Sequence, residues 1–243
     1  MDLKQEIQEK DVVILPPMDY KESCAMVRHS GLFPTCTILD PWYNRGVGGE
    51  MPLAEYDVFI HDLLERTARI CDVIYLWGFP EIIGAYVRDA PIGFSLTGFL
   101  TWYYKNCPTV IKGWRSSQQS CLQFQRYMTD LHPENFMSPE AREKFEEGKA
   151  RFIPGPSSVI EESLLCGFVG KKEQVGHPAQ KPSAVFEKLI LMATEPGDIV
   201  FDPMAGSGTT AAAARKLGRR AIVCDHDSQY IEMIKKRLKL PTK

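Results

Sequence analysis

The chain of 243 residues is long enough for one large α/β domain, with or without a small insertion, and its 44% hydrophobic content is ordinary for a soluble globular protein. A net charge of −2 excludes a protein that binds nucleic acid through overall positive charge. The polar N-terminal residues and the lack of a long apolar run predict neither a signal peptide nor a membrane span, so we expect a soluble intracellular protein.

Seven cysteines are scattered along the chain without a Cys-x-x-Cys pair. This pattern argues against a zinc site and against a disulfide framework. Several of the cysteines lie in apolar segments, where a reduced cysteine behaves as a small hydrophobic residue. We therefore expect structural cysteines and no bound metal.

Strands alternate with helices along most of the chain. Apolar and β-branched runs predict strands at residues 11–15, 35–39, 72–77, 100–105, 198–202 and 220–225. Apolar residues at helical spacing predict helices at residues 20–30, 53–70, 81–88, 184–193, 209–217 and 228–238. Such alternation predicts a mostly parallel, twisted sheet with helices on both faces. In the last helix we expect Lys235, Lys236, Arg237 and Lys239 to lie largely in water.

Residues 108–175 lose this alternation and contain several glycines and prolines, with one charged helical patch at 139–149. A long irregular stretch in a compact chain predicts a functional insertion or disorder. Residues 91–129 contain no acid, and aromatic residues alternate there with basic ones. Phosphate contacts from Lys112, Arg115 or Arg126 are one interpretation, and a solvated surface over a buried aromatic strand is the other.

A glycine turn near the C-terminus follows a predicted strand. Gly206-Ser207-Gly208 would let a ligand approach the main chain, and an alanine-rich helix comes next. The following strand ends at Asp225, where nucleotide-binding sheets place the acid that binds ribose hydroxyls. Ala212 replaces the third glycine of the dinucleotide motif, which favours a smaller adenosyl ligand over NAD. A plain βαβ crossover with a glycine turn is the alternative.

The predicted strand at 35–39 delivers an acid, a proline and two aromatic rings into a loop, as Asp40-Pro41-Trp42-Tyr43. This arrangement indicates either a turn with aromatic cover or a grip on a flat ligand with polar edges.

Three motifs together resemble the amino-methyltransferases that modify exocyclic amines of DNA bases. Asp40-Pro41-Trp42-Tyr43 is similar to the family's Asp-Pro-Pro-Tyr motif, with Trp42 in place of the second proline. Residues 202–209 (DPMAGSGT) resemble its S-adenosylmethionine loop, and residues 177–182 (HPAQKP) resemble the motif just before that loop. Their order is similar to the β group, a circular rearrangement of the usual order. The resemblance implies a Rossmann-like methyltransferase fold in a single domain, 1–243, with 108–175 as a small target-recognition insertion.

The resemblance also implies roles for the motif residues. Asp40 and the Pro41 carbonyl would accept the two N–H bonds of the target amine, and Tyr43 would stack on a base that has left the duplex. Trp42 would stack, wall the pocket or merely pack. Lys181 would support the cofactor pocket, Asp225 would hold the ribose and His226 would lie beside the adenine. The implied cofactor-binding residues are His177, Gln180, Lys181, Asp202, Pro203, Ala205, Gly206, Ser207, Gly208, Thr209, Asp225 and His226.

The function implied by the resemblance is site-specific transfer of a methyl group from S-adenosylmethionine to adenine N6 in DNA. An acid at the first motif position favours adenine over cytosine. The alternatives are the same chemistry on cytosine N4, RNA or single-stranded DNA, and an inactive cofactor- or nucleic-acid-binding module. Related enzymes often dimerise, so a homodimer is one further expectation. The implied location is the cytoplasm of a bacterial or phage-infected cell, in a restriction-modification or related role.

Overall fold

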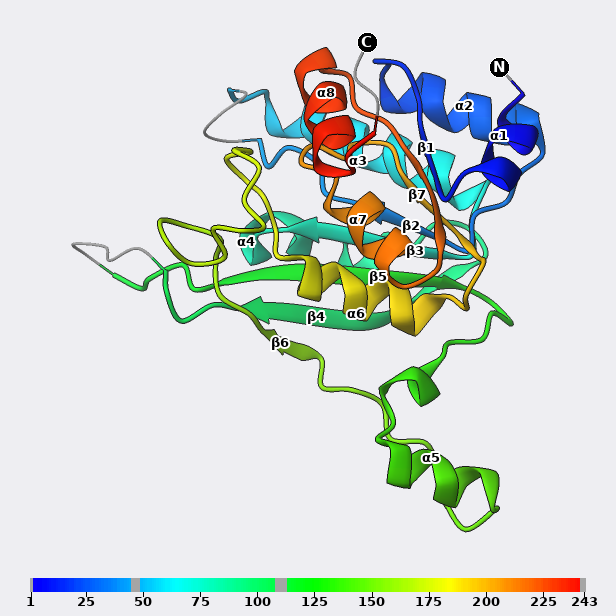
Figure 1. The fold of residues 1–243 in the computed structure, drawn as a ribbon. Helices are drawn as coiled ribbons and strands as arrows, with labels where there is room; N and C mark the ends of the chain where they lie inside the picture. Colours follow the sequence, from blue (N-terminus) through cyan, green and yellow to red (C-terminus); the bar gives the residue numbers. More distant parts are fainter. Residues whose placement is uncertain (1, 45–48, 108–112, 241–243) are drawn as a thin grey trace.

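The computed structural model describes residues 2–44, 49–107 and 113–240. The described strands form an eight-stranded sheet in the order β1-β8-β7-β2-β3-β5-β4-β6 (Figure 1). The strands are β1 (Val12–Ile14), β2 (Cys36–Leu39), β3 (Val73–Gly78), β4 (Phe94–Tyr103), β5 (Gln118–Arg126), β6 (Val159–Glu161), β7 (Ile199–Asp202) and β8 (Arg220–Val223). The first five strands in this order run parallel, and β5 pairs antiparallel with both β3 and β4.

Helices cover both faces of the sheet (Figure 1). They are α1 (Leu3–Glu9), α2 (Tyr20–Ser30), α3 (Leu53–Ala68), α4 (Pro80–Ile83), α5 (Pro139–Glu146), α6 (Ser183–Ala193), α7 (Thr209–Lys216) and α8 (Ser228–Arg237), with 3-10 turns at Gly84–Arg88 and Pro133–Phe136. None of the helices in the described ranges is long and apolar enough to cross a bilayer. The predicted mostly parallel α/β sheet with helices on both faces is confirmed.

Alternation along the central strand β3 explains the two cores. Tyr75 and Trp77 pack in the cluster formed with α6, α7 and α8. Ile74 and Leu76, which point the other way, pack in the cluster formed with α3. Because both faces of these strands are buried, the strands are continuously apolar. This is why the sequence predicts them well.

Strand β5 corrects the prediction for residues 108–175. That stretch was expected to be irregular, yet Gln118–Arg126 lies between β3 and β4 in the sheet. Its alternating glutamines hide the usual apolar signal, although Cys121, Leu122 and Phe124 are fully buried. The sequence also misses α1 and the first half of β4. β6 also lies within this stretch and pairs with β4, so only the other described residues of 113–175 stand outside the sheet. A role of 108–175 in target recognition remains a prediction.

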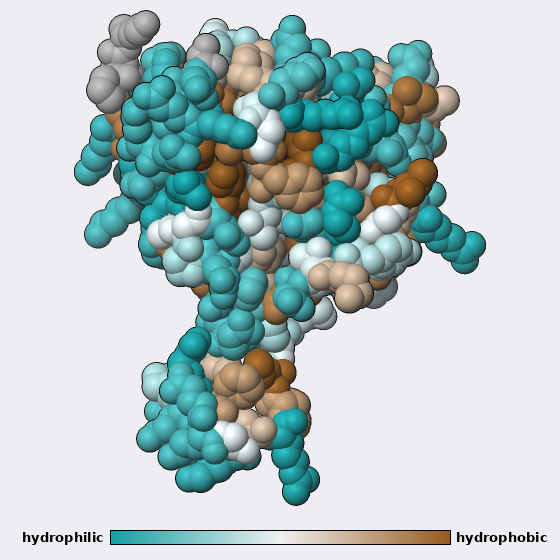
Figure 2. Space-filling view, turned by 90° about the vertical axis from the view of Figure 1, so that its right-hand side faces the viewer, coloured by the Kyte–Doolittle hydropathy of each residue, from teal (hydrophilic) through white to brown (hydrophobic). Residues whose placement is uncertain are grey.

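An arm formed by residues 128–158 extends away from the sheet and carries α5 (Figure 1). Hydrophobic side chains gather on part of the arm (Figure 2). The arm carries two exposed phenylalanines, Phe145 and Phe152. The arm is fastened to α6 where Asn135 Nδ2 donates to the Leu191 carbonyl at 2.8 Å. Acids and bases balance over residues 139–151, so the arm lacks the positive charge expected of a phosphate-binding surface.

Candidate active site

Three acids lie at the same edge of the sheet. Asp40 follows β2, Asp202 ends β7 and Asp225 follows β8, and these strands run parallel. Because the carboxyl ends of parallel strands meet at one edge, residues from distant parts of the chain converge there. We call this the catalytic edge.

Asp40 is held by two side chains. The Tyr43 hydroxyl donates to one carboxylate oxygen, and the Lys181 ammonium group donates to the other. Lys181 also donates to the Tyr43 hydroxyl and lies 5.2 Å from the centroid of the Tyr43 ring. Gln119 Oε1, from β5, lies 3.3 Å from the same hydroxyl. The loop therefore presents an acid whose two oxygens are already oriented.

The electrostatics of this cluster depend on burial. Lys181 is 2% exposed, and burial lowers its pKa, while the nearby Asp40 carboxylate opposes that shift. Burial also raises the pKa of Tyr43 well above its usual value, with the Asp40 charge adding to the effect. Tyr43 therefore stays protonated at neutral pH and can donate to Asp40. The pair thus places the Asp40 carboxylate, whose side chain is 20% exposed, against a buried ammonium group.

Lys181 connects the catalytic loop to the cofactor loop. Its side chain reaches Asp40, whereas its main-chain carbonyl accepts a hydrogen bond from Thr209 Oγ1 at 3.2 Å. The main chain of Lys181 thus contacts the cofactor loop, and its support of the cofactor pocket stays a prediction. Its ammonium group lies at the catalytic residues, across 141 positions of sequence.

Trp42 packs against α3. Its indole N–H donates to the Gly49 carbonyl at 3.2 Å, and its ring meets Tyr56 edge to face at 5.7 Å between centroids. The Tyr56 hydroxyl donates to the Trp42 carbonyl at 2.8 Å. Of the three roles left open by the sequence, the structure favours packing. These contacts restrain a loop that lacks the family's second proline.

The cofactor loop requires glycine at two positions. Gly206 and Gly208 have positive φ values of 45° and 72°, a region that side chains rarely tolerate. A Cβ atom on Gly206 would lie 2.9 Å from His177 Nε2, and one on Gly208 would lie 3.0 Å from the Ile234 side chain. The HPAQKP segment and α8 thus approach the turn too closely for any larger residue. Burial lowers the pKa of His177, which favours a neutral ring beside the turn.

The Asp225 carboxylate is buried beside this turn. It accepts from the Gly206 N–H at 2.9 Å and from the Asp227 N–H at 3.0 Å. His226 is exposed, with Nδ1 3.2 Å from the same carboxylate. A carboxylate has about four lone-pair sites, so Asp225 can still accept from the hydroxyl groups of a ribose. The turn and this acid therefore fit the adenosyl part of S-adenosylmethionine.

Asp202 is buried at the end of β7. Its carboxylate accepts from the Met204 N–H at 3.0 Å and from the Thr210 hydroxyl at 2.5 Å. Pro203 and Ala205 continue this turn, and the Ala205 N–H donates to the Cys224 carbonyl at 2.8 Å. Asp202 therefore shapes the loop from inside.

Asp202 makes stability depend on pH. Burial raises its pKa from the ordinary value of 3.8 to about 7. Because the folded protein binds this proton more tightly than the unfolded chain does, the free energy of unfolding decreases as pH rises from about 4 to about 7. The Asp202→Asn side chain stays neutral throughout. We therefore expect the Tm of the variant, minus that of the wild type, to increase across this window by roughly 10 °C in calorimetry. A difference that is constant with pH would contradict the assignment.

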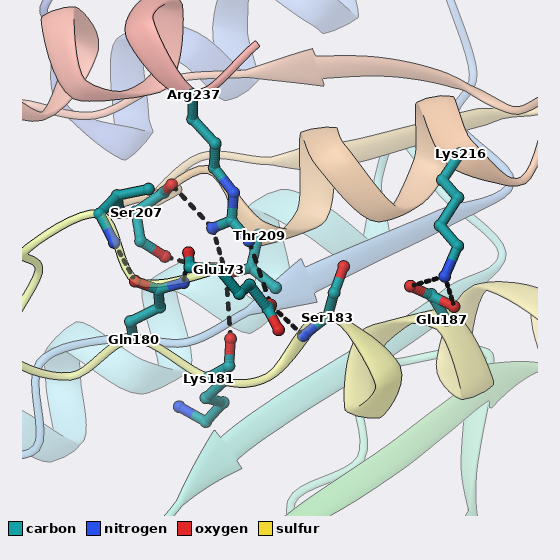
Figure 3. A network of polar contacts seen from close by, with 10 residues as sticks. Glu173, Gln180, Lys181, Ser183, Glu187, Ser207, Thr209, Lys216 and Arg237 are labelled. Carbon is teal, nitrogen blue, oxygen red and sulfur yellow. Dashed lines mark hydrogen bonds and ion pairs between the residues drawn. The ribbon is translucent and has the colours of Figure 1, made fainter. Parts of the chain in front are cut away.

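Arg237 and Glu173, for which the sequence predicts no role at the site, hold it together (Figure 3). Arg237, predicted to lie in water, has a side chain only 8% exposed. It donates to the Ser207 carbonyl at 3.0 Å and to Thr209 Oγ1 at 2.9 Å, and it pairs with Glu173 at 3.2 Å. In the sequence, Arg237 lies beside the apolar face of α8, and this position is the signal that could have predicted its burial. Arg237 thus joins α8 to the cofactor loop.

Gln180 serves the segment before the cofactor loop. Its amide accepts from the Val175 N–H and donates to the Glu173 carbonyl, both at 2.9 Å (Figure 3). The Glu173 carboxylate in turn accepts from the Ser183 N–H at 2.6 Å. The structure therefore gives Gln180 a positioning role in this segment, and its contact with the cofactor stays a prediction.

The three predicted phosphate contacts have different outcomes. Arg115 is exposed in the connection between β4 and β5, at the catalytic edge. Arg126 lies at the opposite edge, where it pairs with Asp72 at 3.0 Å and donates to the Cys71 carbonyl at 2.9 Å. Its guanidinium also lies 4.7 Å from the Phe94 ring centroid, so Arg126 is corrected to a structural role. Lys112 lies outside the described residues.

A parallel sheet with a glycine turn and an acid at adjacent strand ends, next to an Asp-Pro loop, defines an S-adenosylmethionine-dependent methyltransferase. Residues 58–236 match the DNA methylase family of N6/N4 methyltransferases. Because the match covers most of the chain, the chain belongs to this family.

The similar proteins support the same family. Type II methyltransferase M.HpaI of Haemophilus parainfluenzae is 31% identical over 216 residues, which are 83% of this chain and 67% of M.HpaI. DNA adenine methyltransferase YhdJ of Escherichia coli K12 is 48% identical over 66 residues, 27% of this chain and 22% of YhdJ. This chain thus spans about two thirds of the length of M.HpaI and a shorter part of YhdJ.

Solved structures share the fold. The complex of M1.HpyAVI with S-adenosylmethionine superposes with a TM-score of 0.71 at 22% identity, covering 94% of this chain and all of that one. The cytosine-N4-specific PvuII DNA methyltransferase superposes with a TM-score of 0.67 at 14% identity, covering 94% and 86%. At this identity the likeness concerns the fold alone.

Proposed function

We propose that this protein methylates the N6 amine of an adenine at a specific DNA site, after the adenine has turned out of the duplex. The observation that carries the proposal is the position of Lys181, which joins the Asp40 carboxylate to the glycine loop. Because the buried Lys181 contacts both the catalytic acid and the cofactor turn, it fixes their positions relative to each other. M.HpaI and YhdJ are relatives of this chain, and YhdJ is named as an adenine methyltransferase.

Orientation of the target amine is the main task of the catalytic loop. An exocyclic amine is a poor nucleophile because its lone pair is delocalised into the ring. Asp40 and the Pro41 carbonyl accept hydrogen bonds from its two N–H groups, which lets the nitrogen become pyramidal. Each Asp40 oxygen has one protein partner and keeps a lone pair for the amine.

Tyr43 offers one face of its ring for stacking. Its hydroxyl is fixed by Asp40 and Lys181, and its ring meets Phe79 edge to face at 5.1 Å. Lys181 lies over the ring at 5.2 Å, and we propose that a base stacks on the ring face turned away from Lys181. When bound, S-adenosylmethionine supplies the methyl group. The residues that would hold it are the Gly206–Gly208 turn and Asp225.

The identity of the methylated nucleoside tests this proposal. Duplex DNA is incubated with the protein and S-adenosylmethionine carrying a labelled methyl group, then digested to nucleosides and analysed by mass spectrometry. We expect N6-methyladenosine in its deoxy form, and sequencing of the methylated positions gives the recognition site. N4-methylcytosine would instead assign the protein to cytosine, the second candidate, which is favoured by the shared fold of the PvuII enzyme.

Parallel reactions with single-stranded DNA and RNA distinguish the remaining acceptors. Label in neither DNA nor RNA would favour a binding module without catalysis. We further propose that the protein works in the cytoplasm of a bacterial cell, as expected for relatives from Haemophilus and Escherichia. A homodimer remains a prediction, which light scattering would test.

A further inference from the structure

The segment between β6 and the HPAQKP motif forms an ordered loop. We call residues 164–175 the tip loop. The Gln174 side chain donates to the Val169 carbonyl at 2.7 Å and to the Gly167 carbonyl at 3.3 Å. Gly170, with a φ of 64°, packs so closely that a Cβ atom there would lie 2.3 Å from the Leu165 side chain. The shape of the loop is therefore built in by specific contacts.

The tip loop is anchored at both ends beside the catalytic site. At its start, Asn106 exchanges two hydrogen bonds with the Leu164 main chain, at 2.8 and 2.9 Å. At its end, Gln180 holds the main chain of Glu173 and Val175. Lys181, which contacts Asp40, follows Val175 by six residues. β5 runs antiparallel to β3, so it begins at the catalytic edge. The end of β4 pairs with the start of β5, and β6 runs parallel to β4, so both β4 and β6 end at this edge. The tip loop therefore projects from the catalytic edge (Figure 1).

A large aromatic side chain is held in solvent on this loop. Phe168 is 90% exposed, and the Lys171 ammonium group lies 5.7 Å from its ring centroid. The tip loop contains two bases, Lys171 and Lys172, and one acid, Glu173, which pairs with Arg237. The neighbouring connection between β4 and β5 carries Trp114, 99% exposed, beside Arg115. Single exposed hydrophobic residues are common, but this one combines a fixed loop, basic neighbours and the catalytic edge.

We propose that Phe168 inserts into the base stack of duplex DNA next to the target base and fills the space that the base leaves, while Lys171 and Lys172 contact the flanking phosphates. The positive charge of the loop complements the DNA backbone. Apolar side chains that enter a duplex partially unstack a base step, and a fixed loop performs this at a low entropic cost. This inference rests on the proposed function, because it assumes that a base leaves the duplex.

The test compares paired and already opened DNA. Two duplexes carry the recognition site, one with the target base normally paired and one with the target base opposite an abasic site. Single-turnover methylation by Phe168→Ala is expected to be at least tenfold slower than wild type on the paired duplex. On the abasic duplex, where little opening is needed, its rate is expected within about threefold of wild type. Phe168→Trp keeps a large ring, so its methylation rate on the paired duplex should lie close to that of the wild type.

Tyr127→Ala is the matched control. Tyr127 is an aromatic residue, 65% exposed, at the opposite edge of the sheet, and its loss should leave both rates unchanged. Equal slowing of Phe168→Ala on the two duplexes, or slowing on neither, overturns the inference while the proposed function stands. A wild-type protein that methylates cytosine is tested with the same pair of duplexes built around cytosine. A wild-type protein that methylates neither duplex overturns the proposed function itself, and this inference with it.

Discussion

Asp40→Ala is expected to reduce methyl transfer to DNA by at least about 100-fold and to leave the affinity for S-adenosylmethionine within a few-fold of wild type. The carboxylate is the charged acceptor at the catalytic edge, and the cofactor loop does not depend on its side chain for a hydrogen bond. Turnover is measured with labelled cofactor and DNA, and affinity by calorimetry. Because Lys181 would lose its partner while buried, we also expect a lower Tm.

Asp62→Ala provides the control for that loss of stability. Asp62 also accepts from a tyrosine, Tyr20 at 2.8 Å, and from a cation, Arg66 at 2.8 Å, but it lies on α3 away from the catalytic loop. Its removal should change stability and preserve turnover per folded molecule. Native turnover by Asp40→Ala would show that the catalytic assignment is wrong. Loss of turnover in both variants would point to an effect of folding.

Gly206→Ala is expected to weaken S-adenosylmethionine binding by at least about tenfold, a loss of about 1.4 kcal/mol or more. The added Cβ atom would meet the His177 ring at 2.9 Å, and the backbone there has a positive φ. The HPAQKP segment and the glycine turn would have to separate. Because both carry predicted cofactor residues, the binding surface would be distorted. Calorimetric titration of the variant with the cofactor measures the effect.

Gly218→Ala separates backbone strain from this clash. Gly218 has a φ of 72°, and no atom lies within 4 Å of a Cβ placed there. The substitution should cost about 1–2 kcal/mol of stability through the left-handed backbone alone, with cofactor affinity unchanged. Normal binding by Gly206→Ala, or equal weakening in both variants, would refute a role for the close approach between Gly206 and His177.

The limits of prediction are clearest in the strands. β2 and β3 are buried on both faces, so their apolar runs stand out in the sequence. β5 is equally central, but alternating glutamines and a hairpin connection concealed it. The glutamines remain near polar partners, as where Gln123 donates to Thr97 at 2.8 Å. A polar residue with a partner inside the sheet cannot be distinguished from a surface residue by composition.

The sequence by itself determined the motifs that carry chemistry, because each is a local pattern. Asp40 follows a buried strand, and the glycine turn and Asp225 follow two others. Strand direction alone brings all three to one edge. The order of the motifs also sufficed to predict the family and the class of fold.

Only the tertiary structure decided which partners these residues have. Lys181 contacts Asp40, Arg237 joins Glu173 to the cofactor loop and Trp42 packs on Tyr56. It likewise showed that Arg126 is used within the protein, away from the catalytic edge. Each of these contacts joins segments that are distant along the chain or separated by a loop. Their proximity depends on strand order and on how closely the segments pack, and neither of these is encoded in a local pattern of residues.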